Sequence, residues 1–112
     1  MQAVLECPKI AVIRPQGKLN AANALEFERD LTTALTANDV SILLVDLAAV
    51  ESLDSAGLMA LVSALKLAQN LERGLRLCSV SPALKIIFEL TQLDGVFEFE
   101  DNADLIFTNV LI

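Results

Sequence analysis

Residues 41–58 read SILLVDLAAVESLDSAGL, and this stretch decides the fold. Its first part, Ser41 to Leu47, is a short continuous apolar run, which is typical of a central strand covered on at least one face. Its last part opens a helical pattern that starts near Ser55 and runs to about Leu71. A buried strand that leads into an amphipathic helix indicates an α/β fold.

Helical patterns also occur on both sides of this unit. We expect helices over Ala21 to Ala37, from Ser81-Pro82 onward, and in the tail from Asp101. The residues predicted to face the core are Ala24, Phe27, Leu31, Ala34 and Leu35 in the first helix, Leu58, Leu61, Val62, Leu65 and Ala68 in the second, Ala83, Ile86, Ile87 and Leu90 in the third, and Ile106 and Val110 in the last.

The ends of these helices carry recognisable signals. Asn20 is the predicted N-cap of the first helix, and Ser81 caps the third with Pro82 at its first helical position. Gly74 is the predicted stop of the second helix, with Arg73 beside its C-terminal dipole.

The remaining apolar runs predict strands. They are Ala3 to Glu6 and Ile10 to Arg14, joined by a hairpin turn at residues 7–9, then Leu75 to Val80 and Val96 to Phe99. The order is β-β-α-β-α-β-α-β-α, with about five strands and about four helices. Such alternation predicts one α/β domain over residues 1–112, with a mixed, mostly parallel sheet and helices mainly on one face.

Composition excludes several classes of function. The chain carries 15 acids and 8 bases, a net charge of −7, which argues against direct nucleic-acid binding and against an anionic membrane surface. It has no histidine, the commonest general base and metal ligand, so we expect no enzyme, no metal and no cofactor. The two cysteines suit a reducing compartment, and the start of the chain shows no apolar signal-peptide core. We therefore expect a cytoplasmic protein.

The start of the second helix is the best candidate for a functional site. Small residues at Ser55, Ala56 and Gly57 leave this helix start accessible, and its free N–H groups can bind a phosphate. Two purely structural explanations remain open at this point. Asp54 or Ser55 can serve only as an N-cap, and Gly57 can serve only to permit close packing. A serine hydrolase is not supported, because neither a histidine nor a Gly-x-Ser-x-Gly motif is present.

Three segments of the sequence resemble the STAS-domain anti-sigma factor antagonists. Residues 53–58, Leu-Asp-Ser-Ala-Gly-Leu, resemble the family's Asp-Ser-x-Gly-Leu signature. Residues 17–20, Gly-Lys-Leu-Asn, resemble the Gly-x-Leu-Asp that closes its second strand, and residues 78–85 resemble its strand–Ser-Pro–helix segment. The similarity continues through Phe88-Glu89-Leu90 and covers nearly the whole chain.

This resemblance implies a non-enzymatic partner-binding switch. The unphosphorylated antagonist binds an anti-sigma factor that is also a serine kinase of the histidine-kinase-like ATPase fold, and so releases a sigma factor. The kinase phosphorylates the signature serine, which matches Ser55, and a PP2C-type phosphatase reverses the modification. The resemblance thus implies a partner-binding site made by Asn20, Asp54, Ser55, Ala56 and Gly57.

Two positions depart from the family pattern. Asn20 replaces an acid, which keeps hydrogen bonding but loses the charge, and Ala56 replaces a second hydroxyl residue. Met59 is a further candidate for partner contact, because methionine adapts to partners, although its spacing is equally compatible with the core.

One rival interpretation remains, a STAS domain that serves as a binding subunit of another assembly, such as a lipid-transport complex or a signalling scaffold. The intact Asp54-Ser55 pair favours the antagonist. We expect a monomer.

Overall fold

A four-stranded parallel sheet forms the centre of the molecule. The structure, a computed structural model, describes residues 9–37 and 40–100. The sheet has the order β1-β3-β5-β6. Its strands are β1 (Ile10–Ile13), β3 (Ile42–Asp46), β5 (Gly74–Cys78) and β6 (Glu98–Glu100). A separate two-stranded parallel sheet pairs β2 (Gly17–Leu19) with β4 (Val50–Leu53), and the helices are α1 (Ala24–Thr36), α2 (Ser55–Asn70) and α3 (Pro82–Leu90).

The predicted α/β class with a mostly parallel sheet is confirmed. The expected strand at Ala3 to Glu6, its hairpin, and the helix from Asp101 lie outside the described residues. The sequence did not predict β4 as a strand. The buried residues of β4 follow neither an alternating pattern nor a continuous apolar run. Val50 and Leu53 are buried, while Glu51 and Ser52 between them are exposed.

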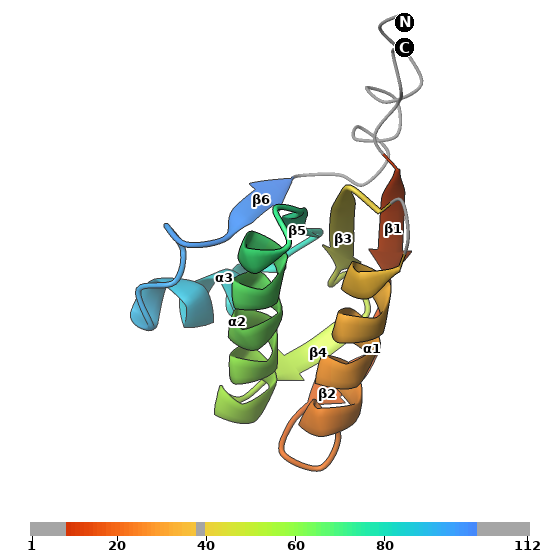
Figure 1. Cartoon of the computed structure of the whole chain (residues 1–112). Helices are drawn as coiled ribbons and strands as arrows, with labels where there is room; N and C mark the ends of the chain where they lie inside the picture. The colour runs from red at the N-terminus through yellow and green to blue at the C-terminus, as the bar shows by residue number, and fades with distance from the viewer. Residues whose placement is uncertain (1–8, 38–39, 101–112) are drawn as a thin grey trace, which may run out of the picture.

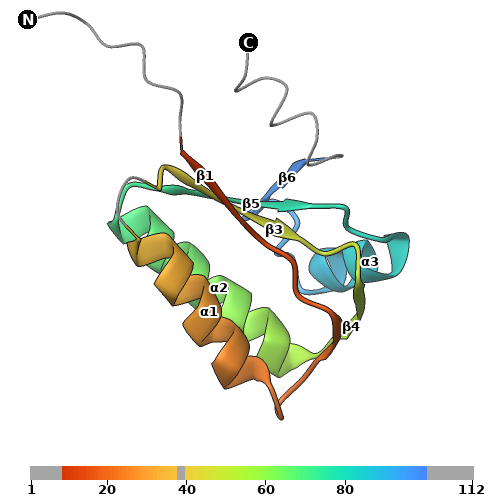
Figure 2. The same cartoon turned by 90° about the vertical axis from the view of Figure 1, so that its right-hand side faces the viewer.

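The core lies between the sheet and two helices, α1 and α2, which pack against the same face (Figure 2). Leu43 and Val45 of β3 join this core, while Leu44 belongs to a smaller cluster with Cys78. β3 is therefore buried on both sides, which agrees with its continuous apolar sequence. Cys78 is buried within this smaller cluster.

α1 and α2 run side by side in the same direction (Figure 1). Most of their predicted core residues are buried, among them Phe27, Leu31 and Leu35 in α1 and Leu58 and Leu61 in α2. Both helices begin at the end of the molecule where β2 and β4 lie (Figure 1). This parallel arrangement places two helix N-termini at one end of the fold.

The end of α2 differs from the prediction. Gly74 is not the helix stop; it is the first residue of β5, and the residue that leaves the helix with a left-handed backbone is Glu72, at φ 57°. The Arg73 backbone N–H donates to the Ala68 carbonyl in the last turn of α2, but the Arg73 side chain serves another helix. Its guanidinium donates hydrogen bonds to the carbonyls of Leu35 and Ala37, at the C-terminal end of α1. Arg73 therefore satisfies orphan carbonyls of a neighbouring helix.

α3 begins as predicted but buries a different face. Ser81 is its N-cap, with the side chain accepting a hydrogen bond from the Leu84 N–H at 3.2 Å, and Pro82 is its first residue. The buried residues are Leu84 and Phe88. Of the predicted stripe, Ile87 is half-buried against the core, whereas Ile86 and Leu90 are exposed, at 54% and 79%, and Ala83 is exposed as well.

The physical reason for this difference is the ring of Phe88. It makes edge-to-face contacts with Phe97 at 5.7 Å and with Phe99 at 5.5 Å. Phe97 precedes β6 and Phe99 lies within it; the strand begins at Glu98, two residues later than predicted. Contacts with residues about ten positions away therefore decide which face of α3 is buried.

Among the helices that the structure describes, none has both the length and the apolar character that crossing a membrane requires.

Candidate functional site

The exposed N-terminus of α2 carries the serine that the sequence singled out. Asp54 is the N-cap, and its Oδ1 accepts a hydrogen bond from the Gly57 N–H at 3.1 Å. Ser55 is the first residue of the helix and is exposed. Its hydroxyl makes no hydrogen bond to any residue in the described part of the chain. Capping by Asp54 thus leaves the Ser55 hydroxyl free for another molecule.

Two backbone donors also remain available at this helix start. The N–H groups of Ser55 and Ala56 have no acceptor among the described residues, as is usual for the first turn of a helix. The helix dipole adds a partial positive charge at the same place. An anionic group attached to Ser55 can therefore be stabilised within the protein.

Gly57 brings α2 against the end of β2. The Asp54 N–H donates to the Leu19 carbonyl at 3.0 Å. A Cβ atom on Gly57 would lie 2.8 Å from the Leu19 carbonyl oxygen and 2.8 Å from Leu53 Cδ1. The close-packing explanation for this glycine is therefore correct. It also serves the site, because it holds the β2 end next to Asp54 and Ser55.

We expect Gly57→Ala to lower the free energy of unfolding by about 1–2 kcal/mol. The added methyl meets the backbone carbonyl of Leu19, so we expect an overpacking cost of about 2–3 kcal/mol, which exceeds the gain in helix propensity of about 1 kcal/mol. Urea denaturation followed by far-UV circular dichroism measures the change. The matched control is Gly95→Ala, which meets nothing within 4 Å and should stay within about 0.5 kcal/mol of the parent. Equal stability of the two variants would show that the contact with β2 is not tight.

Asn20 lies in the turn between β2 and α1 and is not the N-cap of α1. Asn23 occupies that position. The Asn20 side-chain oxygen accepts a hydrogen bond from the Ala22 N–H at 2.9 Å. The Asn20 backbone N–H donates to Asn23 Oδ1 at 2.9 Å. This local network closes a turn before the helix begins, which explains why the sequence signal was misplaced by three residues.

The structure brings the predicted site residues together. Asn20 follows Leu19 directly, and Leu19 contacts the segment from Asp54 to Gly57, so residues more than thirty positions apart share one surface. Met59 lies on the same helix and is 55% exposed, so it is not a core residue.

Sequence reasoning missed Leu25, which is 69% exposed in the first turn of α1. Leu25 lies in the first turn of α1 and Met59 in the second turn of α2, and the two helices start at the same end of the molecule (Figure 1). The sequence did contain a signal for Leu25, because this large apolar residue falls outside the predicted apolar stripe of α1. Exposed apolar residues that gather at one place are typical of protein interfaces.

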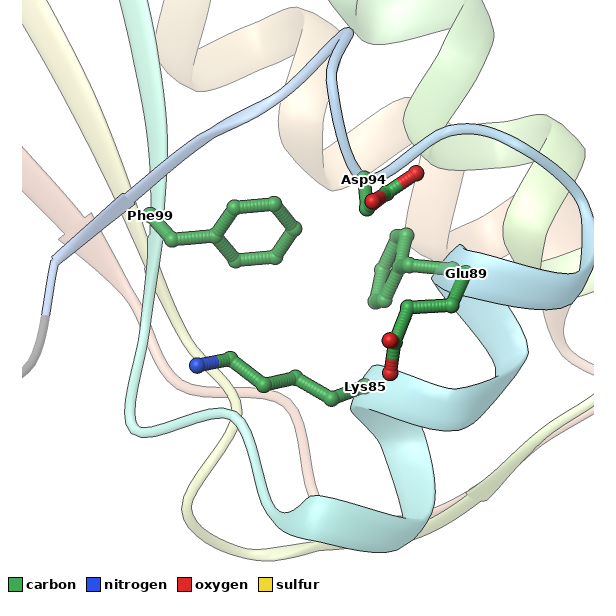
Figure 3. A pocket seen from close by; sticks show the side chains of 5 residues that line it. Lys85, Glu89, Asp94 and Phe99 are labelled. Carbon is green, nitrogen blue, oxygen red and sulfur yellow. The ribbon is translucent and has the colours of Figure 1, made fainter.

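Pockets of similar size lie at two separate places in the described part of the chain. One, of about 270 Å³, lies beside α1; we call it the α1 pocket, and its lining residues are Pro15, Gln16, Leu19, Asn23, Glu26, Phe27 and Asp30. The other, of about 290 Å³, lies between α3 and β6; we call it the α3 pocket, and it is lined by Lys85, Phe88, Glu89, Asp94 and Phe99 (Figure 3). The α1 pocket shares Leu19 with the surface around Ser55.

The described residues contain no group of three acidic, cysteine or histidine side chains placed to bind a metal ion. The nearest charged residues to Ser55 in the sequence are Asp54 and Glu51, both exposed carboxylates. The arrangement is therefore an exposed hydroxyl on a helix N-terminus, with the Asp54 carboxylate as its neighbour in the chain.

Comparisons with known proteins give matches over nearly the whole chain. A family model described as STAS domain matches residues 3–106. An anti-sigma factor antagonist from Mycobacterium paratuberculosis is 27% identical, with a TM-score of 0.77, and the match covers 92% of this chain and 86% of that one.

Two more distant structures share the fold. The Bacillus cell fate determinant SpoIIAA in its phosphorylated form is 16% identical, with a TM-score of 0.66 and 93% of each chain covered. A sulfate transporter family protein from Wolinella succinogenes is 14% identical, with a TM-score of 0.75, and the match covers 91% of this chain and 84% of that one.

Proposed function

Since the chain belongs to the STAS domain family, we propose that it is an anti-sigma factor antagonist whose binding is controlled by phosphorylation of Ser55. In the unphosphorylated state it binds an anti-sigma factor that is also a serine kinase of the histidine-kinase-like ATPase fold. Sequestering this kinase releases a sigma factor for transcription. The observation that carries the proposal is the exposed Ser55 hydroxyl on an α2 N-terminus already capped by Asp54.

The free helix donors explain how the phosphorylated state can persist. A phosphate on Ser55 can accept hydrogen bonds from the Ser55 and Ala56 N–H groups, so the modified protein stays folded. At an interface, the same phosphate must be desolvated, and it lies beside the Asp54 carboxylate. Phosphorylation therefore penalises the complex more than the free protein.

The surface around Ser55 suits a protein partner. Leu25 and Met59 supply exposed apolar contact area, while Ala56 presents only a small side chain beside Ser55. Asn20 adds amide groups without charge. We assign partner binding to Asn20, Asp54, Ser55, Ala56, Gly57 and Met59, and we add Leu25 to them.

The proposal also assigns roles to the kinase, the phosphatase and the antagonist. The nucleotide site and catalytic base belong to the kinase, and the antagonist is a cytoplasmic monomer without enzymatic activity. A PP2C-type phosphatase removes the phosphate and returns the antagonist to its binding state. The similarity to a 27% identical antagonist supports this assignment.

Mass spectrometry of the protein purified from its native cells tests the proposal. We expect a species heavier by one phosphate, with the modification on Ser55, and capture of a serine kinase by an immobilised Ser55→Ala variant. Ser63 is exposed on the same helix and serves as an internal control that should stay unmodified. If Ser55 is never phosphorylated across growth and stress conditions, the switch is wrong.

A second candidate is a binding subunit of a transport assembly, which the structural likeness to a sulfate transporter family protein favours. This candidate predicts an unmodified Ser55 and copurification with a membrane-associated complex. The same purification therefore distinguishes the two functions.

A further inference from the structure

Side chains along the four-stranded sheet alternate between two apolar faces. Leu43 and Val45 of β3 belong to the main core, whereas Leu44 between them belongs to the smaller cluster on the opposite side. Figure 2 shows α1 and α2 on the first side, and Leu84 and Phe88 of α3 join the same core. No helix that the structure describes lies on the second side (Figure 2). We call its apolar residues the outer patch: Ile10, Val12, Ile42, Leu44 and Cys78.

The outer patch is only partly covered by its own neighbours. Leu44 and Cys78 are buried, but Ile10, Val12 and Ile42 around them are half-buried. The strand pairings that the structure describes within this sheet are all parallel. Parallel sheets occur almost only with both faces covered, because their strands carry apolar side chains on both sides. The outer patch therefore requires a covering element.

Two ion pairs border the outer patch and leave its centre uncharged. Arg14 Nε lies 3.2 Å from Asp46 Oδ2, at the carboxyl ends of β1 and β3. Arg76 of β5 lies beside Leu44 in the sheet register, and its Nε is 3.1 Å from Glu98 Oε2 of β6. Between these pairs the patch presents only apolar side chains. An uncharged, apolar element therefore matches this surface better than a charged one.

The segment that follows β6 has the composition and the length to cover this patch. Residues 105–112, Leu-Ile-Phe-Thr-Asn-Val-Leu-Ile, carry no charge, and residues 101–112 are predicted to be helical. In a helix, Ala103, Ile106, Phe107 and Val110 fall on one apolar stripe. Twelve helical residues span about 18 Å, and β1 lies three strand spacings, about 14 Å, from β6. The segment can therefore reach every strand that contributes to the patch.

The segment before β1 is a poorer candidate for the cover. Its predicted strand, Ala3 to Glu6, would pair along the edge of the sheet next to β1. A strand added in this way extends the sheet sideways and leaves its faces open. Residues 101–112 are therefore the part of the chain whose predicted structure suits the outer patch.

We propose that residues 101–112 fold as a helix against the outer patch, with Ile106 and Val110 packed on Val12 and Ile42. The chain itself thus occupies this face, and the start of α2 is left as the surface for protein partners. The outer patch lies on the side of the sheet opposite α2, so the inference goes beyond the proposed function and does not depend on it.

The direct test is a methyl-labelled NOESY spectrum of the full chain. We expect contacts from the methyl groups of Ile106 and Val110 to those of Val12 and Ile42. Contacts from Ile106 and Val110 to the exposed residues of α3 instead, or no contacts at all, would overturn the proposal. So would contacts that appear only between two differently labelled copies of the chain, because a second copy would then be the cover.

A pair of adjacent substitutions gives an independent test in the full chain with Cys7→Ser, in which Cys78 is the one remaining thiol. Ile106→Asp places a charge on the packed stripe, so it should speed alkylation of Cys78 by iodoacetamide at least about tenfold. Leu105→Asp is the matched control, because Leu105 points away from the stripe, and it should change the rate by less than about twofold. Equal rates for the two variants would contradict the proposal.

Circular dichroism of each variant checks that the fold is retained. Should Ile106→Asp unfold the whole protein, the NOESY contacts of the unsubstituted chain still decide the question. Neither measurement involves Ser55 or a kinase, so this inference and the proposed function fail on different experiments.

Discussion

Ser55→Asp is expected to weaken the complex with the serine kinase by about 30- to 1,000-fold, which corresponds to about 2–4 kcal/mol. Authentic phosphoserine adds about −1.5 to −2 charges and should act at least as strongly. The new charge lies beside Asp54 in a protein whose net charge is already −7. Calorimetric titration of the captured kinase with each form, in the presence of ADP or ATP, measures the effect.

The loss of binding must be separated from a loss of folding. An acid at the first position of α2 interacts favourably with the helix dipole, so Ser55→Asp should be as stable as the parent or slightly more stable. Ser63→Asp adds the same charge two turns later on the exposed side of α2, and it should change binding by less than threefold (about 0.6 kcal/mol). If Ser55→Asp and phosphoserine both bind the kinase as tightly as the unmodified protein, the electrostatic switch is wrong.

Phe88→Ala is expected to cost about 3–5 kcal/mol of the free energy of unfolding. Phe88 is fully buried and its ring contacts both Phe97 and Phe99, so truncation leaves a cavity and removes two aromatic pairs. Domains of this size have a total stability of about 5–15 kcal/mol, so the variant should lose a large share of it. Thermal and urea unfolding measure the loss.

Leu90→Ala on the same helix is the matched control, because Leu90 is 79% exposed. We expect its stability to stay within about 0.5 kcal/mol of the parent. The two variants also distinguish the packing of α3 in the structure from the packing expected from sequence periodicity, which predicted Leu90 as a core residue. A larger loss for Leu90→Ala than for Phe88→Ala would mean that α3 packs through the opposite face.

Local signals predicted the starts of α2 and α3 and the central strand correctly. Asp54 caps α2, Ser81 and Pro82 begin α3, and the apolar run at 42–46 is a strand buried on both faces. Capping depends on hydrogen bonds within three residues, and a continuous apolar run reports burial directly. Such features can be read from neighbours in the chain, and the contiguous segment from Asp54 to Met59 was found in this way.

Features that depend on distant residues were not predictable in the same way. Arg73 caps α1 across more than thirty positions, and Asn20 joins the site only because Leu19 contacts Asp54 and Gly57. Periodicity allowed Met59 to face either the core or solvent, since it gives only the spacing of residues along a helix.

By itself, the sequence determined the α/β class, the start of α2 and the serine exposed there. Only the tertiary structure decided which face of α3 is buried and that β2 pairs with β4. It also decided that Glu26 and Asp30 of α1 line one pocket together with Leu19 of β2. The physical reason is the range of the interactions: caps and periodic patterns act within one or two helical turns, whereas aromatic contacts, strand pairing and pockets require segments that the chain separates and folding brings together.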